Sequence, residues 1–184
     1  MKRRFHRGAE VKGKMKVENI IDRQAENPQI PGNLAEWIGE QRLVHLALDA
    51  VQGVNWKAEG KLPGTFSGHR PQMLLTLLTW CYAAGIYSSQ DIARACRESK
   101  TLRYICARNF PDWLILRKFR RQHRELVDEA LRKVLMQAWA GKLDDAETDY
   151  LGYQWIETDL SAQINASVRA RLELAILLDG MDAD

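Results

Sequence analysis

The chain has 184 residues, of which 46% are hydrophobic and 28% are charged, and these values fit one globular domain with extensions. No apolar run approaches the ~20 residues that a membrane span needs, which argues against an integral membrane protein. The basic N-terminus is not followed by the apolar stretch of a secretory signal. The expected location is therefore the cytoplasm.

Charge is distributed unevenly along the chain, although its net value is only +3. Residues 1–16 carry a net charge of +6 and residues 94–133 a net charge of +7, whereas residues 143–184 carry −8. A chain polarised in this way is expected to present a positive surface to a polyanion. The acidic part is expected either to shield that surface or to aid solubility.

Composition divides the chain into three segments. Residues 1–32 are charged, lack periodicity and contain Pro28, Pro31 and Gly32 near their end, which predicts a basic, flexible arm. A solvated tail and a DNA-binding arm both remain open for it. Residues 33–141 are predicted to form a helical domain, and residues 142–184 an acidic linker followed by a C-terminal helix.

Two longer helices are predicted first. Asn33 is a predicted N-cap, and apolar residues at steps of three and four predict one amphipathic helix over residues 34–51, which ends at Gly53. After a glycine-rich loop, Pro71 predicts the first turn of a helix over residues 71–84 that is apolar on nearly every face. Such a helix belongs at the centre of a bundle.

Two short helices are predicted next. Ser88 is a predicted N-cap for residues 89–98, and Thr101 for residues 102–108. The three cysteines of the chain lie in predicted helices and match no zinc-binding spacing, so we expect small, buried, apolar side chains in a reducing compartment. They are Cys81, Cys96 and Cys106.

A Pro-Asp pair at positions 111 and 112 precedes the longest predicted helix. Asp112 is expected to cap a continuous helix from Trp113 to about Ala140, which Gly141 ends. The inward-facing residues are predicted to be Leu116, Phe119, Leu126, Val127, Ala130, Leu131, Val134, Leu135 and Ala138.

A last helix is predicted from about residue 159 to residue 178, with Asp159 as its N-cap. Its predicted apolar stripe consists of Val168, Leu172, Ala175 and Ile176. No segment shows convincing strand-like alternation. The predicted class is all-α, a helical bundle that contains a helix-turn-helix-like unit and one long helix toward the C-terminal side.

Five basic residues gather in the first half of the long predicted helix. They are Arg117, Lys118, Arg120, Arg121 and Arg124. The i, i+4, i+7 spacing of Arg117, Arg121 and Arg124 predicts that these three share one side of the helix. The planar guanidinium suits phosphates and guanine edges, so this helix is a candidate for entry into the major groove. The alternative is a solvated face paired with Glu125 and Asp128.

Basic residues on the preceding short helices are candidates for phosphate contacts, with plain solvated surface an equal alternative. They are Arg94, Arg97 and Lys100, with Arg103 nearby. Signals for catalysis are weak, because the chain has no glycine-rich phosphate loop, no nucleophile motif and no metal-ligand cluster. We therefore predict no catalytic residue, no metal and no cofactor.

Five short motifs follow one another along the chain: Arg70-Pro-Gln-Met-Leu-Leu, Tyr82-Ala-Ala-Gly-Ile-Tyr-Ser-Ser-Gln-Asp-Ile, Leu102-Arg-Tyr-Ile, Pro111-Asp112 and Phe119-Arg120-Arg121-Gln-His123. In this order they resemble the N-terminal domain of bacterial insertion-sequence transposases, the transposase InsH N-terminal family. The resemblance implies a helical DNA-binding domain that recognises transposon ends. In full members a ribonuclease-H-like domain with catalytic Asp-Asp-Glu residues and divalent metal follows.

This chain departs from the family pattern in two places. Ile115 stands where the family motif has threonine. The segment at Asp159 is faintly similar to the one around the family's first catalytic aspartate, but only 25 residues follow it, too few for the rest of the catalytic domain. We therefore expect a protein that recognises double-stranded DNA, such as transposon-end inverted repeats, without catalysis, and that associates with the bacterial nucleoid. The alternative is a helical interaction or dimerisation module that regulates a transposase or another partner. A homodimer is compatible with both.

Overall fold

The computed structural model describes residues 30–56, 64–145 and 153–181. These residues form eight helices, which confirms the predicted all-α class. The helices are α2 (Leu34–Ile38), α3 (Glu40–Gln52), α4 (Pro71–Ala83), α5 (Ser89–Glu98), α6 (Lys100–Ile105), α7 (Trp113–Gln122), α8 (Arg124–Asp145) and α9 (Tyr153–Met181). Most of the predicted arm, residues 1–29, and part of the predicted linker, residues 146–152, lie outside the described residues.

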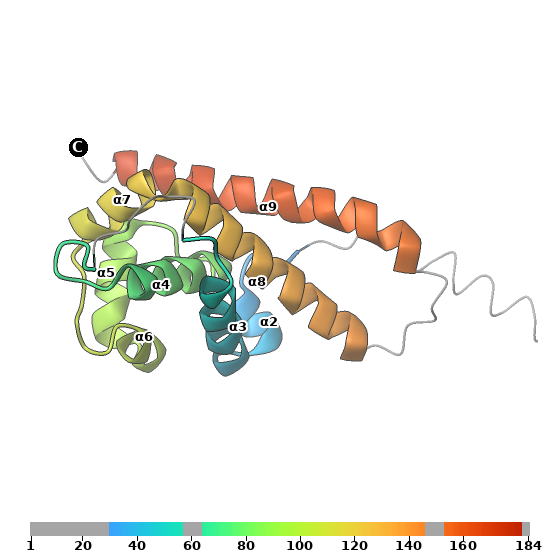
Figure 1. Ribbon diagram of the computed structural model, residues 1–184, viewed down its shortest axis with the longest axis horizontal. Coiled ribbons are helices and arrows are strands. Elements are labelled where there is room, and N and C mark those ends of the chain that lie inside the picture. The colour runs from blue at the N-terminus through green and yellow to red at the C-terminus, as the bar shows by residue number, and fades with distance from the viewer. Residues whose placement is uncertain (1–29, 57–63, 146–152, 182–184) are drawn as a thin grey trace, which may run out of the picture.

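The helix α4 occupies the centre of the bundle. Every residue from Leu74 to Ala83 is buried, as expected for a helix that is apolar on nearly every face. The helices α3 and α8 both pack against α4, and α9 packs along α8. Figure 1 shows α8 and α9 as two long neighbouring helices, with α5, α6 and α7 gathered at one end of the bundle.

Predicted caps begin three of the helices. The side chain of Asn33 accepts a hydrogen bond from the backbone N–H of Ala35 at 3.0 Å, and that of Asp112 accepts one from Ile115 at 2.8 Å. Ser88 begins α5 in the same way. These contacts satisfy backbone donors that a helix start otherwise leaves unpaired, so three start positions follow directly from the sequence.

The start and the end of α6 differ from the prediction. Ser99, and not Thr101, is its N-cap, because the Ser99 hydroxyl accepts a hydrogen bond from the N–H of Leu102. The Thr101 hydroxyl instead donates to the carboxylate of Glu40 at 2.6 Å. The helix ends at Ile105, and residues 107 and 108 follow with φ angles of 47° and 62°. Positive φ lies outside the right-handed helical region, so this helix is shorter than predicted.

Two helices that the sequence predicts as continuous are broken. The segment 34–51 divides at Gly39, whose φ of 89° and ψ of 142° are essentially restricted to glycine. The long helix divides at His123, whose φ of −124° and ψ of 40° are not helical. In contrast, Gly141 lies inside α8, which continues to Asp145. The predicted inward residues of α7 and α8 are nevertheless all buried.

The helix α9 begins earlier than predicted, at Tyr153, so Asp159 lies inside the helix and is not its N-cap. Val168, Leu172 and Ala175 are buried, as predicted, but Ile176 is 45% exposed. Two charged residues of α9, Arg171 and Asp179, are buried as well. The face that α9 turns to the bundle is therefore partly polar.

Arg171 ties α9 to the end of α4 and to the chain before α2. Its guanidinium donates to the carbonyl oxygens of Gly32 at 2.9 Å and of Tyr82 at 2.6 Å, and to the hydroxyl of Tyr87 at 3.3 Å. Burial lowers the pKa of Arg171. The negative end of the α4 dipole and these oxygen atoms offset the cost of burying the charge.

The cysteines behave as predicted for small apolar residues. Cys81, Cys96 and Cys106 are all buried and none forms a disulfide. Burial raises the pKa of the Cys81 thiol, which keeps it protonated. The Sγ atoms of Cys96 and Cys106 lie 3.7 Å apart, where α5 and the end of α6 meet.

Candidate nucleic-acid interface

The candidate interface is built on α7, a ten-residue helix with two different faces. Leu116, Phe119 and Arg120 face the bundle and are buried. The buried Pro111 and the Asp112 cap fix where the helix starts, and the break at His123 fixes where it ends. Because α7 is anchored along its inner face, its outer face is held in a defined position against the bundle.

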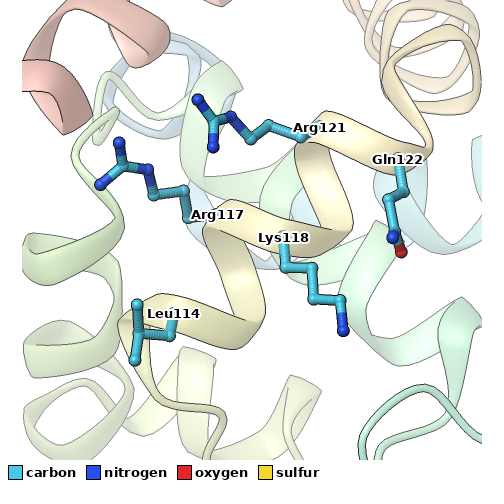
Figure 2. Close-up of a pocket in the computed structure, with 5 residues that line it drawn as sticks. All are labelled: Leu114, Arg117, Lys118, Arg121 and Gln122. Atoms are coloured by element: carbon cyan, nitrogen blue, oxygen red, sulfur yellow. The ribbon is translucent and has the colours of Figure 1, made fainter.

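The outer face of α7 carries an apolar residue among cations. Leu114, Arg117, Lys118, Arg121 and Gln122 line a surface hollow of about 460 Å³. Figure 2 shows Arg117 and Arg121 projecting side by side from successive turns, with Lys118 and Gln122 on the other flank of the helix. We refer to these five residues as the α7 outer face.

No acid in the part of the chain that the structure describes neutralises the cations of the α7 outer face. Among the described residues, Arg117, Lys118 and Arg121 form no ion pair with an aspartate or glutamate. Lys118 Nζ lies 5.9 Å from the centroid of the Phe66 ring, a contact that leaves its charge in place. Asp128, one of the two acids expected as partners, pairs with Arg132 instead. A solvated charged face stays the alternative to a DNA-binding one.

For Arg120 the structure corrects the prediction of a DNA contact. Its side chain is 3% exposed and pairs with Asp179, which is also 3% exposed. Nη1 of Arg120 donates to the Tyr82 hydroxyl at 3.2 Å. Burial alone would lower the pKa of Arg120, but Tyr82 and Asp179 raise it above its usual value. Arg120 therefore lies inside the bundle and has no free surface for a ligand.

Asp179 is the residue that joins α9 to the candidate interface. Besides pairing with Arg120, its carboxylate accepts hydrogen bonds from the backbone N–H and the hydroxyl of Ser89, each at 2.8 Å. Ser89 is the first residue of α5, where a carboxylate is also favoured by the helix dipole. One side chain of α9 thus holds α5 and α7 together.

Arg124 is exposed, but it does not continue the α7 outer face. It is the first residue of α8, beyond the break at His123. The predicted i, i+4, i+7 alignment of Arg117, Arg121 and Arg124 assumed one continuous helix, and the structure divides that helix at His123. As a phosphate contact beside α7, Arg124 stays a prediction.

The basic residues on α5 and α6 are exposed and differ in their contacts. Arg94 pairs with Asp91 at 3.1 Å, and both side chains are more than half exposed. The backbone carbonyl of Arg97 accepts a hydrogen bond from Arg103 Nε at 2.8 Å. Lys100 is exposed in the first turn of α6. As phosphate contacts, Arg94, Arg97 and Lys100 stay predictions.

Residues 64–122 match the family model described as Transposase domain (DUF772). The chain contains a transposase-related domain. The match extends from the loop before α4 to the last residue of α7, so the α7 outer face lies within it. Neither the curated proteins nor the solved structures include one that matches the chain.

One ion pair joins the residues that match the family model to a helix outside the match. Arg120 lies within the matched residues, whereas its partner Asp179 lies outside them on α9.

The described residues include no group of three histidine, cysteine or acidic side chains that could hold a metal ion. None of the described helices is long and apolar enough to cross a membrane.

Proposed function

We propose that the chain binds duplex DNA through the α7 outer face, as a transposase-related DNA-binding protein that does not act as a catalyst by itself. The observation that carries this proposal is the set of cations on that face, Arg117, Lys118 and Arg121, which no acid of the described residues neutralises. Unpaired arginines on a rigid helix suit phosphates and guanine edges.

The dimensions of α7 support groove binding. A helix of ten residues is about 15 Å long, and a helix with its side chains fits the major groove, which is about 12 Å wide. α5 packs against both α6 and α7, an arrangement that suits a helix-turn-helix-like unit with α7 as the recognition helix. In this arrangement Arg94, Arg97, Lys100 and Arg124 would contact phosphates beside the groove.

The resemblance to insertion-sequence transposases suggests the kind of DNA. We propose transposon-end inverted repeats as the target, with occupation of those ends as the way in which the chain regulates transposition. The bacterial nucleoid is then the place where it acts.

An equilibrium titration tests the proposal. The purified chain is added to a fluorescent duplex carrying a sequence selected from a random pool, and anisotropy is recorded at low salt. Saturable binding that exceeds binding to a scrambled duplex is expected. Absence of affinity for any duplex at low salt would reject the proposal.

A second candidate function, self-association, is favoured by an apolar stripe on α9. Leu174, Leu177 and Met181 follow the i, i+3, i+7 spacing of one helix face and are 37%, 60% and 67% exposed. A twofold dimer through this stripe would leave α7 free for DNA. Light scattering of the chain and of a Leu177→Glu variant tests it: a dimer that the variant converts to a monomer supports the candidate, and a monomeric parent chain rejects it.

A further inference from the structure

Leu114 is the apolar residue of the α7 outer face, so attraction to phosphates does not account for its presence there. It is the second residue of α7 and is 56% exposed, whereas Leu116 on the inner face of the same helix is fully buried. Arg117 and Lys118 follow it at i+3 and i+4, so the three side chains neighbour one another. Figure 2 shows Leu114 at the start of the helix, below the two arginines.

This position is the part of a recognition helix that reaches base edges. In helix-turn-helix proteins the N-terminal residues of the helix contact bases, while flanking residues contact the backbone. The only apolar group that a base pair presents in the major groove is the C5-methyl group of thymine. Leu114 lies beside Arg117 and Lys118, so the cations can hold the helix in the groove while the leucine offers an apolar surface that suits thymine.

We infer that Leu114 contacts the C5-methyl group of a thymine and so specifies that base in the DNA target. The inference rests on the proposed function, since it names a base that the same face would read. Arg117 lies three positions after Leu114, or about 4.5 Å along the helix axis, and successive base pairs are about 3.4 Å apart. The thymine is therefore expected within about two base pairs of the position that Arg117 contacts.

The experiment replaces thymine by uracil, which lacks only the methyl group. Each thymine of the duplex selected by the parent chain is exchanged in turn for deoxyuridine, and the affinity of the full chain is measured. At one position the exchange is expected to weaken binding about fourfold, the value for one apolar carbon group removed from contact. Leu114→Ser is expected to abolish this dependence, so that it binds both duplexes equally.

A matched control separates the contact from a general loss of stability. Met136→Ser removes an apolar residue of similar exposure, 50%, from α8 and is expected to keep the fourfold dependence. A selected site without thymine, a uracil exchange without effect at every position, or the same loss in Leu114→Ser as in the parent chain would each overturn the contact alone. Absence of any duplex binding would overturn the proposed function together with it.

Discussion

Replacement of Asp179 by alanine is expected to lower the free energy of unfolding by about 3–5 kcal/mol, because it leaves the buried charge of Arg120 without its partner. The same substitution removes the acceptor of the two hydrogen bonds from Ser89. Urea denaturation followed by circular dichroism measures the change. A loss below ~1 kcal/mol, which is the value for an exposed pair, would contradict the buried arrangement.

Two further variants isolate the ion pair itself. Arg94→Ala removes a pair that is largely exposed, so we expect it to change stability by less than about 1 kcal/mol. Arg120→Met/Asp179→Ala removes both buried charges, and its loss is expected to be smaller than the sum of the two single losses because no unpaired charge remains. Strictly additive losses would indicate that the two residues do not interact.

The second large effect is expected on DNA affinity. Arg117→Gln/Arg121→Gln removes from the α7 outer face two guanidinium groups that no acid of the described residues pairs with, and each contact of such a group with DNA is worth about 1–3 kcal/mol. The affinity for the selected duplex should therefore fall by at least about thirtyfold, measured by anisotropy at one fixed salt concentration. The free energy of unfolding should change little, since neither residue belongs to the buried core.

The control for this variant has the same net charge. Lys142→Gln/Arg169→Gln also removes two positive charges, but from the C-terminal end of α8 and from α9. Because charges beyond a Debye length are largely screened, we expect it to weaken binding by less than about threefold at physiological salt. Equal losses in the two variants would show that net charge alone, and not the α7 outer face, determines the affinity.

Local chemistry explains how much of the fold could be predicted from the sequence. Asn33, Ser88 and Asp112 cap helices because their side chains reach backbone donors two or three residues away. The apolar spacing likewise identifies the buried faces of α4 and α8. The breaks at Gly39 and His123 could not be predicted in this way, because apolar spacing continues on both sides of each.

Arg120 shows why the candidate site could be predicted only in part. It lies in a run of basic residues, so a local view places it at the surface with Arg117 and Arg121. Its burial depends on Asp179, which is 59 residues away along the chain and on another helix. The position next to Phe119 and four residues after Leu116 does place Arg120 beside the buried stripe, but spacing alone cannot identify a distant counter-charge.

The burial of Arg171 on α9 could not be predicted from the sequence for the same reason. Its acceptors include carbonyl groups at the end of α4 and before α2, which no side-chain motif indicates. The sequence predicts most of the buried apolar residues of α9, but it does not predict the burial of Arg171 and Asp179. The spacing of apolar residues does not predict polar contacts between helices that are far apart in the sequence.

The salt dependence of duplex binding tests the central claim most directly. If the α7 outer face and its neighbours neutralise DNA phosphates, the logarithm of the association constant should fall linearly with the logarithm of salt concentration, with a slope of about −0.9 for each phosphate contacted. For the parent chain on its selected duplex we expect a slope steeper than about −3, and a shallower one for Arg117→Gln/Arg121→Gln. A slope near zero in the parent chain, or the same slope in both, would contradict DNA binding through α7.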